Sequence, residues 1–154
     1  MRSSTRARAD INPSEIHPAT DKSGKGRRST RRNLAALALF VYGSTFLWLT
    51  AAFAGTAKPP GGITWAVTDT FAYLSIVMFS GAAWSIFKSR SWWENIAAAA
   101  AVLGSLGLIP YLIAALSLGL PGPGINTTFH VVGNAIVLSS LLIPELRRRV
   151  EVWL

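Results

Sequence analysis

Four long apolar stretches, with nearly all of the positive charge on one side of them, constrain this chain more than any other feature. Each stretch is about as long as the roughly 18–20 apolar residues that a helix needs to cross the core of a bilayer. We therefore predict an all-α fold, an integral membrane four-helix bundle with up-down-up-down order over residues 34–146. The predicted spans are residues 34–54, 64–87, 96–119 and 126–143.

The distribution of lysine and arginine predicts how the chain is oriented. Nine of the 15 basic residues precede the first span, two lie between spans two and three, and three follow span four. Only Lys58 lies in a loop on the other side. Because loops rich in Lys and Arg stay in the cytoplasm, we predict that both termini are cytoplasmic. The abundance of Ala, Gly and Arg suggests a bacterial source, and hence the inner (plasma) membrane.

Residues 1–33 form a basic segment that we predict to be a disordered cytoplasmic tail, because it has too little apolar surface to offset the entropy of ordering. Residues 147–154 are predicted to be a short cytoplasmic C-terminal tail. The net charge of +8 suits attraction to anionic lipid headgroups. Nucleic-acid binding is the other use of a basic tail, but its composition alone does not establish that use, and we predict no nucleic-acid partner.

Arg31 and Arg32 precede the first apolar run, as in a twin-arginine export signal, and Ala52-Phe53-Ala54 would supply a small-x-small cleavage site. The alternative is an ordinary basic flank that orients a first span. We favour the flank, because the run contains bulky residues and three more spans follow it.

The residue types present exclude several kinds of chemistry. The chain has no cysteine, which rules out disulfides, thiol catalysis and thiolate metal sites. It also lacks a phosphate-binding loop, a dinucleotide fingerprint and a zinc-protease motif. One intramembrane histidine does not supply two haem ligands. We therefore predict no catalytic residues, no metal and no cofactor.

Small residues at helical spacing indicate close helix packing in the third span. Ala97, Ala101 and Ser105 lie four residues apart, and Ala100 and Gly104 form an adjacent stripe. Such faces let helix backbones approach one another in lipid. They predict packing within the bundle or, alternatively, a surface for another protein.

Charged and aromatic residues mark the expected ends of the spans. Trp92 and Trp93 are predicted at the inner membrane interface and Trp65 at the outer one. Glu94 and Glu145 lie near basic residues at the inner boundary, and we predict that they form interfacial charge pairs.

The polar residues within the spans are the candidates for a binding site, since buried charge in a membrane is costly. Asp69 and His130 lie about 7–8 Å and about 6 Å of helix rise from the outer ends of their spans. Tyr73 follows Asp69 by one turn, and Asn134 follows His130 by one turn. Tyr111 lies about 12 Å from the outer end of its span, level with Tyr73 and Asn134. We predict that Asp69 and His130 face the bundle interior and pair, directly or through one water, and that all five residues are candidate ligand-binding residues.

Two functions fit these features. The preferred one is a non-enzymatic accessory or scaffolding subunit of a larger membrane assembly, with membrane lipids and either a membrane protein or a second copy as partners. The alternative is a small-molecule or lipid-binding protein, either a carrier or a membrane enzyme, that uses the outer-leaflet residues. A binding protein should have a cavity at the depth of these outer-leaflet residues. An accessory subunit should instead have these residues buried without a cavity, and should leave an apolar face exposed for a partner.

Overall fold

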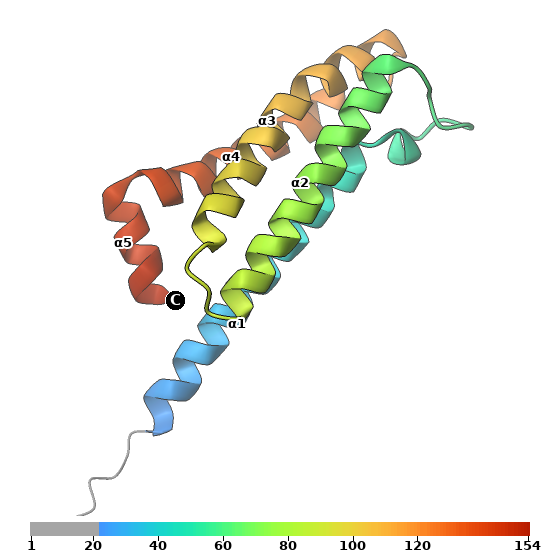
Figure 1. Cartoon of the computed structure of the whole chain (residues 1–154). Coiled ribbons are helices and arrows are strands. Elements are labelled where there is room, and N and C mark those ends of the chain that lie inside the picture. Colours follow the sequence, from blue (N-terminus) through green and yellow to red (C-terminus); the bar gives the residue numbers. More distant parts are fainter. Residues whose placement is uncertain (1–21) are drawn as a thin grey trace, which may run out of the picture.

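The computed structural model describes residues 22–154, which form five α-helices and two short 3-10 helices and contain no strand (Figure 1). Four helical segments are long and apolar enough to cross a membrane, the first of them Arg28–Leu49 and the others α2, α3 and α4. The α-helices are α1 (Lys22–Ser44), α2 (Ile63–Phe87), α3 (Trp93–Ser117), α4 (Pro123–Leu142) and α5 (Pro144–Trp153), and the 3-10 helices are η2 (Thr45–Leu49) and η3 (Ala51–Phe53).

The first predicted span is not one regular helix. After Ser44 the chain continues as η2, breaks at Thr50, whose backbone is extended, and forms η3. The Thr45 and Thr50 hydroxyls donate to the carbonyl oxygens of Tyr42 and Leu47, at 2.6 and 2.7 Å. Such side-chain bonds to nearby carbonyls compete with the regular helical pattern, which explains why the α-helix ends here.

Helix α1 begins at Lys22, so the prediction of disorder is wrong for residues 22–33. The segment continues the apolar part of α1, and extending an existing helix does not repeat the cost of nucleation. The segment is also held by contacts: Arg28 Nε donates to the carbonyl oxygen of Leu154 at 3.3 Å, and Arg32 donates to the Ser89 hydroxyl. The same prediction for residues 1–21 lies outside the described residues.

The predicted C-terminal tail is largely helical. Ile143 has an extended backbone, and Pro144 then starts α5 at a position where its missing N–H is not needed. Helix α5 turns back from α4 toward α1, so that the C-terminus lies beside α1 (Figure 1). Leu146, Val150 and Trp153 follow one another at helical spacing, as in an amphipathic helix.

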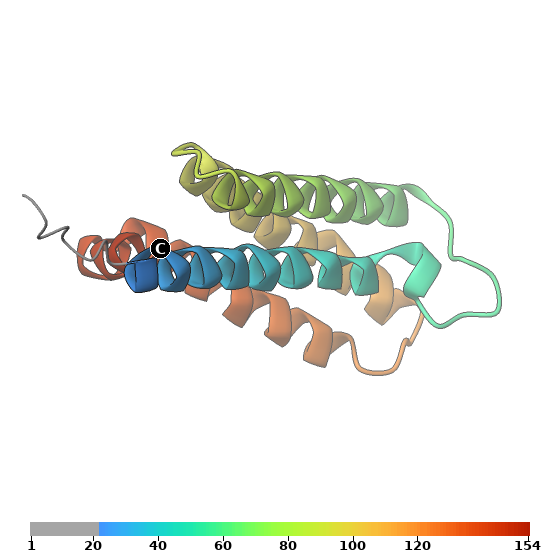
Figure 2. The ribbon, with the colours of Figure 1, turned by 90° about the horizontal axis from the view of Figure 1, so that it is seen from below.

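Each long helix packs on its neighbour in the chain, and α2 against α3 is the most extensive of these contacts. Figure 2 shows the four long helices side by side, with α5 at the end where α1 begins. Ala97, Ala100 and Ala101 are fully buried, which confirms that the small residues of α3 serve close packing. At Gly107 a Cβ atom would lie 2.6 Å from Cβ of Phe71 in α2.

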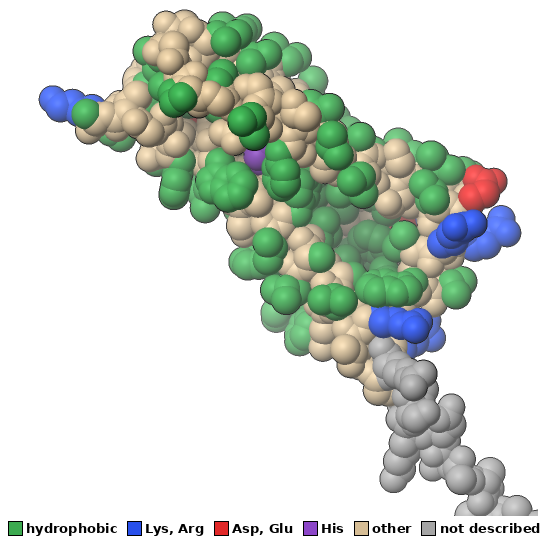
Figure 3. All heavy atoms as spheres, turned by 180° about the vertical axis from the view of Figure 1, so that it is seen from behind, with side chains coloured by type: hydrophobic (Ala, Val, Ile, Leu, Met, Phe, Trp, Pro, Cys, Tyr) green, Lys and Arg blue, Asp and Glu red, His purple; other side chains and the backbone are tan. Residues whose placement is uncertain are grey.

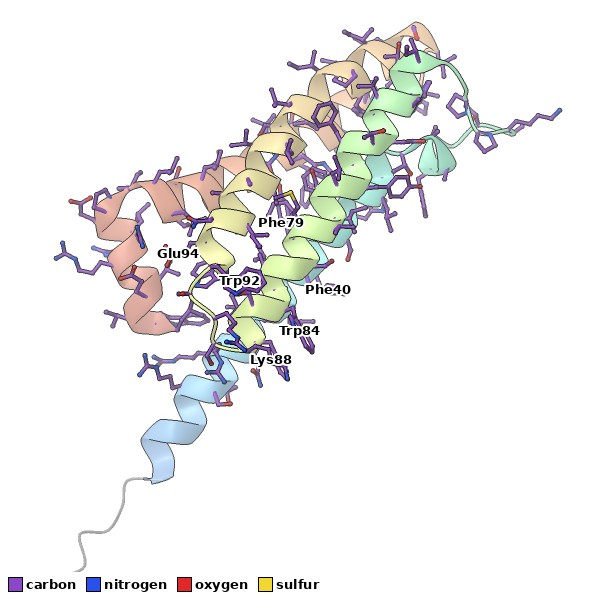
Figure 4. All side chains as sticks on the ribbon, viewed as in Figure 1. Phe40, Phe79, Trp84, Lys88, Trp92 and Glu94 are labelled. Atoms are coloured by element: carbon purple, nitrogen blue, oxygen red, sulfur yellow. The ribbon has the colours of Figure 1, made fainter. Side chains whose placement is uncertain are left out.

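The end of the bundle that carries α5 is rich in basic and aromatic residues, and we call it the basic end. The Lys88 ammonium lies 4.8 Å from the ring centroid of Trp84, an arrangement visible in Figure 4. Arg147 of α5 forms an ion pair with Glu94 of α3 at 2.7 Å. The predicted charge pairing of Glu94 is confirmed, and it joins α5 to the bundle.

Candidate functional site

Polar side chains from three helices meet around Asn134, deep in the bundle. The Tyr42 hydroxyl of α1 donates to Asn134 Oδ1 at 2.8 Å, and Asn134 Nδ2 donates to Ser105 Oγ of α3 at 3.0 Å. The Ser105 hydroxyl donates in turn to the carbonyl oxygen of Ala101 at 2.8 Å. Asn134 is 1% exposed, so these bonds connect α1, α4 and α3 inside the protein. We call Tyr42, Thr45, Ser105, His130 and Asn134 the polar network.

His130 is fully buried, and each of its ring nitrogens lies within 3.2 Å of an oxygen atom. Nδ1 lies 2.8 Å from the carbonyl oxygen of Asn126, and this contact requires a proton on Nδ1. Nε2 lies 3.2 Å from the Thr45 hydroxyl. The ring also packs edge-on against Phe46 and Phe129, with centroid distances of 4.5 and 5.2 Å. Thr45 and Phe46 belong to η2, so His130 packs against the irregular segment that follows α1.

The sequence positions this network through helical spacing and two glycines. His130 and Asn134 lie one turn apart on α4 and so share a face. Gly133 lies against the Tyr42 ring, and a Cβ atom there would overlap it. At Gly104 of α3 a Cβ atom would lie 2.6 Å from the Phe46 ring and 3.2 Å from Asn134 Nδ2. Both glycines allow aromatic rings to approach the helix backbone.

The structure does not bond Asp69 to His130, and the prediction of a direct pair is wrong. Asp69 Oδ1 accepts a hydrogen bond from the Ala51 backbone N–H at 2.8 Å, at the start of η3. The two residues were predicted at equal depth, but depth does not fix the direction in which a side chain points around its helix axis. Helices α2 and α4 both pack on α3 and η2, but the two side chains bond different groups, the Ala51 N–H for Asp69 and the Asn126 carbonyl oxygen for His130.

The two tyrosine candidates have different surroundings. The Tyr111 ring is buried, and its hydroxyl accepts from Asn126 Nδ2 at 3.1 Å. Tyr73 is 47% exposed and lies on the outside of α2. Asn126 links Tyr111 to His130, because its carbonyl oxygen lies 2.8 Å from His130 Nδ1. His130, Asn134 and Tyr111 are therefore connected by hydrogen bonds, Asp69 and Tyr73 are not part of that cluster, and the role of all five as ligand-binding residues stays a prediction.

Two apolar grooves lie on the surface of the bundle, and none of the five candidates lines either of them. The α3–α4 groove has a volume of about 420 Å³ and is lined by residues that include Leu108, Leu112, Val131 and Ala135. The α1–α4 groove has a volume of about 540 Å³ and is closed at the basic end by α5. Figure 3 shows this side of the molecule, hollowed and covered by hydrophobic side chains.

Sequence reasoning missed Tyr42 and Thr45, and it assigned Ser105 only to a packing stripe. A signal for the first two was present: they lie three residues apart on the first span and offer hydroxyl groups on one helix face. The prediction started from Asp69 and His130 and added residues of similar depth on the later spans, so the hydroxyl groups of the first span were left out. Within residues 22–154, no three His, Asp or Glu side chains gather as a metal site would require.

The different hydrogen-bond partners of Asp69 and His130 predict that their substitutions act independently. We expect the effects of Asp69→Asn and His130→Gln on the free energy of unfolding in detergent to add in the double variant, within roughly 0.3–0.5 kcal/mol. Tyr42→Phe with Asn134→Leu is the matched comparison, because these two side chains share a bond. A double variant of Asp69 and His130 that is clearly more stable than the two single effects predict would contradict the geometry.

Comparisons with known proteins find no relative. No family model matches the chain, and neither a curated protein nor a solved structure matches it significantly. What the protein does is therefore inferred from its own residues and their geometry.

Proposed function

We propose that this protein is a non-enzymatic accessory or scaffolding subunit of a larger assembly in a bacterial inner (plasma) membrane. Its four apolar helical segments cross the bilayer in up-down-up-down order, and both termini are cytoplasmic. The orientation is supported by the basic residues at the α5 end and by the single lysine, Lys58, on the opposite side.

The observation that carries the proposal is that the polar side chains within the spans are buried and bonded to other parts of the bundle. His130 and Asn134 are 0% and 1% exposed, and their bonds run to neighbouring parts of the bundle, η2, α1 and α3. Polar groups in lipid commonly join helices in this way. A binding function through the same residues requires a ligand to reach two side chains that have almost no exposed surface.

The α3–α4 groove is the surface that we assign to a partner. Its lining combines large aliphatic side chains with the small residues Ser105 and Ala135. Small residues let a neighbouring helix approach closely, and van der Waals packing is a main source of helix association in lipid. A transmembrane helix of another membrane protein or of a second copy fits this chemistry.

A pair of adjacent valines on α4 allows a matched test. Val131 lines the groove and Val132 does not, and each is 51% exposed. Purification in mild detergent, followed by sizing and mass spectrometry, should yield the wild-type chain with a stoichiometric protein partner or as a defined oligomer. We expect Val131→Trp to lose that partner and Val132→Trp to keep it.

Two results would contradict this proposal. One is a wild-type chain that purifies as a monomer from gently solubilised membranes. The other is equal loss of the partner in both tryptophan variants, which would show that association does not use the α3–α4 groove.

A further inference from the structure

The α1–α4 groove is a second surface, separate from the one assigned to a protein partner. Most of its lining comes from α1 and α4, which meet through the Tyr42 side chain, and α5 lines one end. Ala35 and Ala38 of α1 and Gly133 of α4 line it, and these small side chains leave the space between the two helices unfilled. Its volume of about 540 Å³ is within the roughly 300–1,000 Å³ of small-molecule sites.

A basic hollow adjoins this groove at its α5 end. Arg31 of α1 and Arg148 and Arg149 of α5 line the hollow, whose volume is about 330 Å³. Trp153 lines both the hollow and the groove, so the two are adjacent. Figure 3 shows basic side chains beside the hollowed apolar face.

The three arginines of the hollow differ from their neighbour Arg147. Arg147 is engaged by Glu94 at 2.7 Å and by Glu151 at 3.0 Å. Arg31, Arg148 and Arg149 form no ion pair with any residue in the described range 22–154. Three guanidinium groups around one hollow suit a phosphate, because arginine offers it paired N–H donors in a fixed plane.

We infer that the α1–α4 groove and the basic hollow together form a binding site for an anionic phospholipid. An acyl chain lies in the groove between α1 and α4, and the phosphate lies among Arg31, Arg148 and Arg149. The amphipathic helix α5 rests at the membrane interface, where its basic residues face the headgroups and its apolar residues face the chains.

The charge of the hollow favours a lipid over a protein helix as the occupant. A helix would fill the apolar groove but leave the three arginines without an acidic partner. A phospholipid supplies an apolar chain and a phosphate together, at the depth where the groove meets the hollow. Under the proposed orientation this site lies in the cytoplasmic leaflet, whose anionic lipids attract basic residues.

Native mass spectrometry of the full chain in detergent tests the site, with phosphatidylglycerol as the probe and phosphatidylcholine as the neutral comparison. We expect one phosphatidylglycerol to remain bound to the wild-type chain and phosphatidylcholine to be retained much less. The double variant Arg148→Gln/Arg149→Gln should lower the affinity for phosphatidylglycerol by roughly thirtyfold. Lys88→Gln/Arg90→Gln removes the same charge from the same end without touching the hollow, and should retain the lipid.

A second pair of variants tests the groove itself. Ala38 and Ala66 are both exposed helical alanines, but only Ala38 lines the groove. Ala38→Trp should abolish retention of phosphatidylglycerol, whereas Ala66→Trp should not. Melting temperatures without added lipid show whether each variant is folded.

Three outcomes would overturn the inference: equal retention of the two lipids, equal loss in both charge variants, or retention that survives Ala38→Trp. Binding of a protein instead of a lipid in the groove, detected as a partner lost only in Ala38→Trp, would also overturn it. The test in detergent depends neither on the orientation in the membrane nor on the partner at the α3–α4 groove. Its failure is therefore distinguishable from failure of the proposed function.

Discussion

Replacing Gly104 with leucine should lower the free energy of unfolding in detergent by roughly 1–3 kcal/mol, the usual cost of overfilling a packed core. Even the first added atom, Cβ, would lie 2.6 Å from the Phe46 ring. Phe46 is fully buried and packs against Tyr42, Phe79 and His130, at centroid distances of 5.8, 5.7 and 4.5 Å. The ring has no free space to move into, so the substitution disturbs η2 and the polar network together.

Gly81→Leu is the matched control for this prediction. Gly81 also lies within a long helix, but a Cβ atom there would meet nothing within 4 Å. We expect the free energy of unfolding of this variant to lie within about 0.5 kcal/mol of the wild-type value, as is usual for surface substitutions. If Gly104→Leu and Gly81→Leu were equally stable, that result would contradict the close packing of η2 on α3.

The helices themselves were predictable because length and apolar composition are local properties of a sequence. The three later spans begin within a few residues of their predicted starts and end close to their predicted ends. The break after Ser44 was not predicted, because it depends on which carbonyl oxygens accept hydrogen bonds from the Thr45 and Thr50 hydroxyls. Nor was the ordered start of α1, which is held by contacts with Leu154 and Ser89, residues remote in the sequence.

The candidate site was predictable only in part, for a physical reason. Helical spacing correctly joined His130 to Asn134, because residues four apart share a face. The partners of that face depend on how each helix is rotated about its axis, which neither depth nor spacing determines. Asp69 bonds to the Ala51 N–H instead, and the Thr45 hydroxyl is the side-chain group that lies against His130 Nε2.

The orientation of the four spans underlies the proposed function, and the sequence offers an unusually clean test of it. The natural chain contains no cysteine, so a single introduced thiol is the only one that a maleimide reagent labels. Gly61 lies in the exposed connection between η3 and α2, and Val152 of α5 is 80% exposed near the C-terminus. The proposed orientation, which follows from the charge distribution, places these two positions on opposite sides of the membrane.

The most direct measurement is labelling of Gly61→Cys and Val152→Cys in intact cells with a membrane-impermeant maleimide. We expect near-complete labelling of Gly61→Cys, and labelling of Val152→Cys only after the cells are permeabilised. Efficient labelling of Val152→Cys in intact cells, or protection of Gly61→Cys until permeabilisation, would contradict a four-span protein with cytoplasmic termini.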